Sequence, residues 1–133
     1  MLVRCDMGGA YISHDGGTSW RMFNLRGTVG FFAFDEGDRN IIYAASIALF
    51  RSADRGKTWR MLYPPPLQLD RIEQSGDHAG ETVILKDGAA PRMDAIAQDP
   101  TVPKRLFLAL HEARSGAALG RRQARLVTCR MGL

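Results

Sequence analysis

Short apolar segments alternate with polar turns along this chain of 133 residues. Residues 11–12 and 41–45 are examples: both hold isoleucine and tyrosine, and both lie between segments that contain Asp, Asn, Gly or Ser. Brief apolar runs with β-branched and aromatic residues, bounded by turn formers, are typical of β-strands. The pattern therefore predicts short strands joined by tight turns.

Two eight-residue segments, residues 13–20 and 52–59, repeat the pattern Ser-x-Asp-x-Gly-x-Ser/Thr-Trp. The copies lie 39 residues apart, and an Arg-Met pair follows each of them. In tight turns an Asp side chain bonds nearby backbone N–H groups, and glycine adopts positive φ without steric cost. Each copy is therefore predicted to be a hairpin turn inside a repeat unit of about 40 residues.

This pattern resembles the Asp-box (BNR) repeat of sialidases, sortilin-like receptors, xyloglucanase-type glycoside hydrolases and photosystem II assembly-factor-like proteins, which carry it on β-propeller blades. The resemblance implies a structural box, in which the Asp holds the turn and the Trp packs between neighbouring blades. We expect an all-β fold made of antiparallel blades of an incomplete Asp-box β-propeller. The box residues on this match are Ser13, Asp15, Gly17, Trp20, Ser52, Asp54, Gly56 and Trp59.

A third blade is predicted to begin near Ile96, because residues 34–45 align with residues 98–109. No third box follows, and residues 113–133 hold five Arg and no acidic residue. We therefore assign residues 1–112 to a partial propeller of about two blades and residues 113–133 to a basic tail of uncertain structure. This tail is either a solvated segment or short helix, or the product of a shifted or truncated reading frame. It lacks interleaved aromatic residues, so no nucleic-acid partner is expected.

An insertion is predicted near residues 64–92, because the offset of 64 residues between Asp35 and Asp99 exceeds the box period by 25. Within it, residues 81–86 carry β-branched side chains, and Asp87-Gly88 could supply a turn. This segment is either a short hairpin arm or a mobile loop. Long propeller loops commonly line a binding face.

The chain is too short to close a propeller, which needs at least about four blades of ~40 residues. Its first strand aligns inside a blade, so a fragment of a longer ancestral protein is the favoured explanation. Unclosed blades leave edge strands with unpaired backbone groups. We therefore expect either oligomerisation or additional chain segments to complete the ring.

Composition places the chain among folded proteins, with 45% hydrophobic and 24% charged residues. No apolar run is long enough for a membrane span. No signal peptide is visible, so the chain as written is expected to be cytoplasmic, although an intact ancestor is expected to be secreted, as many Asp-box proteins are. Cys5 and Cys129 fit no metal or redox motif and are expected to be free thiols. The three histidines are scattered, so neither a metal nor a cofactor is expected.

One segment is a candidate for chemistry: residues 6–11 read Asp-Met-Gly-Gly-Ala-Tyr. It resembles the first-blade segment of xyloglucanase-type glycoside hydrolases, and on that match Asp6 is a catalytic carboxylate. The structural alternative is that Asp6 caps the Gly8-Gly9 turn. Glycoside hydrolysis needs a second carboxylate, and the other acidic residues fall in turns or in the insertion.

Two functions therefore stay open. The first is a module that binds or assembles with a protein or a glycan and is not catalytic alone. The alternative is a remnant of a secreted polysaccharide-cleaving glycoside hydrolase, with Asp6 as an inherited carboxylate.

Overall fold

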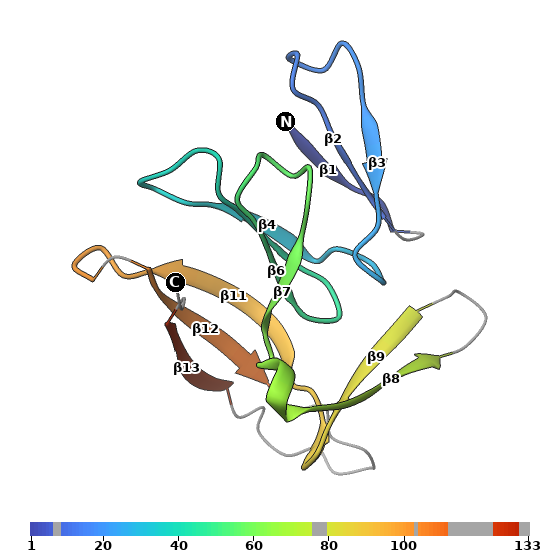
Figure 1. Ribbon diagram of the computed structural model, residues 1–133, viewed down its shortest axis with the longest axis vertical. Coiled ribbons are helices and arrows are strands. Elements are labelled where there is room, and N and C mark those ends of the chain that lie inside the picture. The colour runs from blue at the N-terminus through green and yellow to red at the C-terminus, as the bar shows by residue number, and fades with distance from the viewer. Residues whose placement is uncertain (7–8, 76–79, 103, 112–123, 131–133) are drawn as a thin grey trace.

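The computed structural model describes residues 1–6, 9–75, 80–102, 104–111 and 124–130. Strands in these residues form four antiparallel sheets, and no α-helix occurs among them (Figure 1). None of the four sheets closes into a barrel. The predicted all-β fold, with antiparallel blades of an incomplete propeller, is therefore confirmed.

Three of the sheets are blades, which follow one another along the chain. Blade 1 is a three-stranded sheet of order β1-β2-β3, and blade 2 is a four-stranded sheet of order β4-β5-β6-β7. Their strands are β1 (Leu2–Arg4), β2 (Ala10–Ile12), β3 (Arg21–Phe23), β4 (Phe31–Phe34), β5 (Ile42–Ala45), β6 (Leu49–Ser52) and β7 (Arg60–Tyr63).

Blade 3 is a three-stranded sheet of order β11-β12-β13. Its strands are β11 (Arg92–Gln98), β12 (Arg105–His111) and β13 (Ala124–Arg130). The third blade thus begins close to Ile96, as predicted. Strand β13 lies in the segment that the sequence analysis assigned to a basic tail of uncertain structure, and it pairs with β12 over seven residues of each strand.

The insertion forms a sheet of its own. A short 3-10 helix, η1 (Pro66–Gln68), leads into β8 (Leu69–Ser75), β9 (Gly80–Leu85) and β10 (Gly88–Ala89). Of the two alternatives for residues 81–86, the structure shows the hairpin, since Gly88 pairs with Leu85. The apolar side chains of Val83 and Leu85 explain this order, because both are buried against the blades.

The core lies between blades rather than inside any one of them. One apolar cluster joins blade 1 to blade 2 through residues such as Ile12, Phe23 and Phe50, and β9 covers part of it. A second cluster joins blade 2 to blade 3 through residues such as Leu49 and Leu108. A thin sheet buries little by itself, so each blade depends on its neighbours for stability.

The second box shows how the repeated pattern makes its turn. Asp54 accepts hydrogen bonds from the backbone N–H of Thr58 at 2.9 Å, from its hydroxyl at 2.6 Å and from the Ser52 hydroxyl at 2.8 Å. The Ser52 oxygen in turn accepts the backbone N–H of Gly56 at 2.7 Å. Gly56 has φ of +80°, which favours glycine, and a Cβ atom there would also lie 2.6 Å from the Ile12 Cδ1 methyl group.

The first box repeats these bonds. Asp15 accepts from the backbone N–H of Ser19 at 2.9 Å and from the Ser13 hydroxyl at 2.8 Å, and Gly17 donates to the Ser13 oxygen at 2.7 Å. The hydroxyl and the backbone N–H of Ser19 hold the pKa of Asp15 well below its usual range. The corresponding groups of Thr58 do the same for the pKa of Asp54.

The two box tryptophans have different surroundings, although the two boxes make the same internal hydrogen bonds. Trp59 stacks on Phe23 of blade 1, with ring centroids 5.2 Å apart and an interplanar angle of 11°. Trp20 is 41% exposed, and its indole N–H donates to the Gly17 carbonyl at 3.0 Å. The equivalent carbonyl of Gly56 instead accepts from Arg21 of blade 1 at 2.6 Å. The second box is therefore bonded to a preceding blade.

The first prediction concerns the buried serine of the second box. Ser52 is 1% exposed, and Ser52→Ala leaves the buried N–H of Gly56 without an acceptor. The expected loss is about 1–3 kcal/mol in the free energy of unfolding, measured by urea denaturation. The matched control is Ser46→Ala, because the buried Ser46 hydroxyl has no hydrogen-bond partner among the described residues. An equal loss in both variants would contradict this account.

The second prediction concerns acid stability. Because the folded-state pKa values of Asp15 and Asp54 lie below the unfolded value of about 4, their stabilisation is complete above that pH and decreases as the pH falls below it. Urea midpoints measured from pH 7 to pH 2 should fall below pH about 4. Asp54→Asn should flatten this dependence. An unaltered acid profile in Asp54→Asn would rule the explanation out.

Candidate functional site

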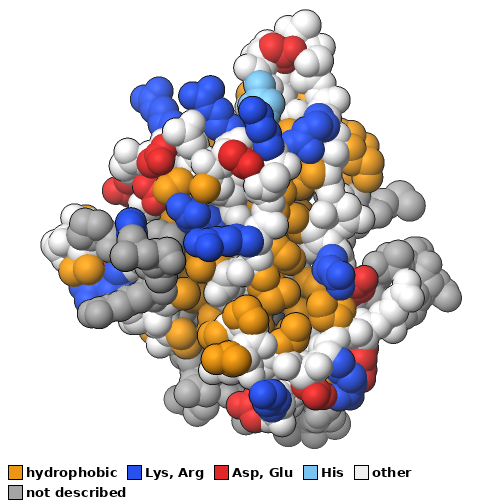
Figure 2. All heavy atoms as spheres, viewed as in Figure 1, with side chains coloured by type: hydrophobic (Ala, Val, Ile, Leu, Met, Phe, Trp, Pro, Cys, Tyr) orange, Lys and Arg blue, Asp and Glu red, His pale blue; other side chains and the backbone are white. Residues whose placement is uncertain are grey.

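The insertion sheet and the blade turns meet at one edge of the blades. Antiparallel pairing brings the start of β4, the end of β5 and the start of β6 to this edge. Residues 90–93, which lead into blade 3, also reach it. In the view of Figure 2, hydrophobic side chains gather at the centre of the molecule, with Lys and Arg side chains around them.

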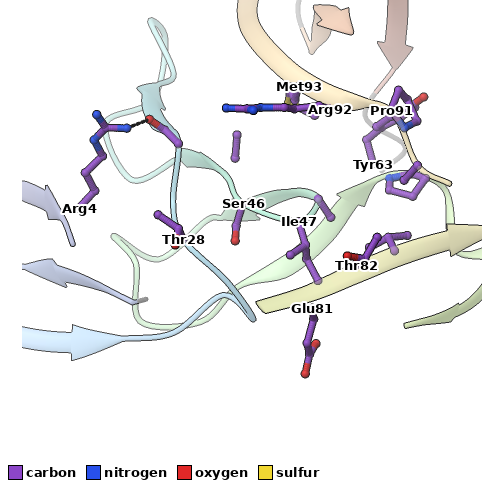
Figure 3. A pocket seen from close by; sticks show the side chains of 16 residues that line it. Arg4, Thr28, Ser46, Ile47, Tyr63, Glu81, Thr82, Pro91, Arg92 and Met93 are labelled. Carbon is purple, nitrogen blue, oxygen red and sulfur yellow. Dashed lines mark hydrogen bonds between the residues drawn. The ribbon is translucent and has the colours of Figure 1, made fainter. Parts of the chain in front are cut away.

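A cavity of about 450 Å³ lies where these segments meet (Figure 3). Ser46 and Ile47 line it from the turn between β5 and β6, Thr82 from β9, and Tyr63 from the end of β7. Arg92 closes the opposite side from the start of β11. The lining therefore combines apolar groups with hydroxyls, an aromatic ring and basic side chains.

The charges around this cavity are predominantly positive. The Arg4 guanidinium donates to the Gly30 carbonyl at 2.7 Å, which fixes its direction without neutralising its charge. The Arg92 side chain is exposed, and it makes no ion pair within the described part of the chain. Glu81 also lines the cavity, but it is paired with Arg26 at 2.9 Å. An anionic group in the cavity would thus meet two cations and one carboxylate that is already paired.

Ser46 adds an unused polar group to the cavity wall. Its hydroxyl oxygen is buried and lacks a hydrogen-bond partner among the described residues. Buried hydroxyls are normally bonded to protein or to water. On the strand next to Arg92, its register partner His111 pairs with Asp94, with 2.5 Å between Nδ1 and Oδ2.

Asp6 lies at the same edge, in a neighbouring hollow of about 520 Å³ that Tyr11 and Thr28 also line. Its side chain is exposed, and Cys5 Sγ approaches Oδ1 at 3.9 Å. Asp6 is the one acidic residue among the described residues that line this hollow. The proposed capping of the Gly8-Gly9 turn involves Gly8, which lies outside the described residues.

The structure separates Asp6 from the box residues. The boxes connect β2 to β3 and β6 to β7, so both turns lie at the edge opposite the cavity. Their carboxylates are used inside their own turns. The boxes therefore lie at one edge of the blades, and the cavity and Asp6 lie at the opposite edge.

Neither cysteine forms a disulfide, and burial raises the pKa of the Cys129 thiol. The described residues contain no group of three or more His, Cys, Asp or Glu side chains that could hold a metal ion. The described chain also contains no helix long and apolar enough to cross a membrane.

Sequence reasoning missed the cavity and its basic residues. Arg4 and Arg92 are 88 positions apart, and no motif connects them. The available signal was the insertion itself, since a long segment between blades was expected to line a binding face. Which residues it would bring together depends on how β9 folds back over the turn after β5.

Comparisons with known proteins bear on the first box. Residues 11–22 match the family model described as BNR/Asp-box repeat. No match is found among curated proteins or solved structures. The second box makes the same internal hydrogen bonds as the first. The match identifies a repeat of this type at residues 11–22, and such repeats occur in β-propeller-type modules of glycoside hydrolases and of binding proteins.

Proposed function

We propose that this chain is a propeller-type binding module, and that the cavity beside the insertion sheet takes an acidic glycan. The observation that supports this most directly is the Arg92 guanidinium at the cavity wall, exposed and without an ion pair among the described residues. A planar guanidinium forms two parallel hydrogen bonds to a carboxylate. A uronic acid presents such a carboxylate on a compact ring.

The size and lining of the cavity favour a sugar over a protein surface. A volume of about 450 Å³ is in the range of small-ligand sites, whereas protein partners bind over broad surfaces. Tyr63 offers a ring against which a sugar face can pack, and Ser46 and Thr82 offer hydroxyl groups. A protein partner is the alternative, and it is indicated if neither sugar binds in the experiment below.

Hydrolysis with Asp6 as the catalytic carboxylate has less support. Both retaining and inverting mechanisms place a second carboxyl group across the glycosidic bond. The described residues around Asp6 contribute no second acid to its hollow. We therefore propose binding without bond cleavage for this chain, and keep Asp6 as the residue to substitute if cleavage is ever observed.

The third prediction is a charge-dependent affinity. Trigalacturonate should bind the full chain more tightly than the neutral sugar cellotriose, as measured by isothermal titration calorimetry. Arg92→Ala should weaken trigalacturonate binding by about 10- to 100-fold, because it removes a charge-assisted hydrogen bond.

Arg39→Ala is the matched control, since it removes the same charge from the turn between β4 and β5, at the edge opposite the cavity. It should leave the affinity unchanged. Equal affinity for the two sugars, equal effects of the two variants, or no binding of either sugar would refute an acidic-glycan site. The last of these results would direct the search to protein partners.

A further inference from the structure

Blade 1 exposes an apolar sheet face. Val3, Tyr11 and Met22 are register partners on three adjacent strands, so they form one row across the blade. Their exposed fractions are 47%, 37% and 54%, and Trp20 beside them is 41% exposed. We call this row with Trp20 the front face of blade 1. The opposite face of the blade, with Ala10, Ile12 and Phe23, is buried.

The repeat shows what such a front face does in blade 2. The positions 39 residues later are Ile42, Phe50, Met61 and Trp59. All four belong to the apolar cluster between blades 1 and 2, where Ile42 is 3% and Phe50 8% exposed. The front face of blade 2 therefore packs on the back face of blade 1.

The next interface in the chain has the same arrangement. Leu106 and Leu108 of β12 align with Ile42 and Ala44 of β5, and they are fully buried against blade 2. Their partners there include Tyr43 and Leu49, which lie on the back face of that blade. At both interfaces, the front face of one blade packs on the back face of the blade before it.

Among the described residues, no blade packs on the back face of blade 3. Two rows of register partners cross its three strands on the side away from blade 2, with mostly small or apolar side chains. The Arg105 guanidinium lies 5.7 Å from the Phe107 ring centroid in one row, and Leu126 in the other is 71% exposed. The rows are Ala95–Ala109–Leu126 and Ala97–Phe107–Thr128.

We propose that a second copy of this chain docks its blade 3 back face on the blade 1 front face. Contacts between a front face and a back face already occur twice within the chain, between blades 1 and 2 and between blades 2 and 3. The two exposed faces lie on blade 1 and blade 3, on either side of blade 2 (Figure 1). A contact between two different surfaces, here a front face and a back face, is a heterologous contact. Heterologous contacts form a ring when the rotation that relates neighbouring copies leads back to the first copy.

Two copies make the simplest closed assembly. The described residues of each copy form three blades, so a pair provides six, within the range of four to eight found in closed propellers. In that pair each front face meets the partner's back face, and both interfaces are equivalent. This surface is separate from the proposed glycan cavity, so either proposal can fail without the other.

The test uses the mass of the full chain in solution, measured by sedimentation velocity over a range of concentrations. The wild-type chain should be a dimer. Met22→Asp on the front face and Leu126→Asp on the back face should each weaken self-association by at least about tenfold, because a carboxylate then enters an apolar contact. Tyr11→Lys is a second front-face variant in case Met22→Asp does not fold, as judged by circular dichroism.

A mixing experiment tests the pairing of the two faces. Met22→Asp retains its back face and Leu126→Asp retains its front face, so an equimolar mixture should restore a dimer through the one intact contact. Leu67→Asp is the matched control, because Leu67 is 85% exposed in η1 and lies on neither face. A monomeric wild-type chain, a mixture that stays monomeric, or dissociation by Leu67→Asp would each overturn the proposal.

Discussion

The packing of one blade's front face on the back face of the preceding blade is the interaction on which the rest of this structure depends. The stacked rings of Trp59 and Phe23 form part of this contact, and the apolar clusters on both sides of blade 2 extend it. Sheets of three or four short strands cannot bury enough apolar surface alone. The Asp box supports the contact because its hydrogen-bonded turn precedes β7 and orients the tryptophan.

The two boxes share their internal hydrogen bonds but differ in their contacts with a neighbouring blade. Both make the same bonds among Ser, Asp and the backbone, so the turn depends on its own residues. Among the described residues, only the second box has a preceding blade, and there Arg21 bonds to Gly56 while the indole of Trp59 stacks on Phe23. The environment of the tryptophan therefore reports whether a blade is present at its side.

Sequence alone predicted much of the fold, because all the residues that form the turn of an Asp box lie within eight consecutive positions. The turns before β5 and β12 were also visible: Asp35 and Asp99 each accept backbone N–H groups two and three residues later. Strand β13 was not predicted, since its arginines and the loss of the box obscured its apolar residues. The cavity was not predicted either, because Arg4, Ser46 and Arg92 meet only through tertiary folding.

The central claim is that stability resides between blades, and a double-mutant cycle on Phe23→Ala and Trp59→Ala tests it most directly. Urea unfolding of the wild type, both single variants and the double variant gives the coupling between the two rings. We predict a coupling of about 1 kcal/mol, as found for stacked aromatic pairs beyond their area of burial. A coupling of zero, with additive losses, would contradict the claim that this inter-blade contact stabilises the fold.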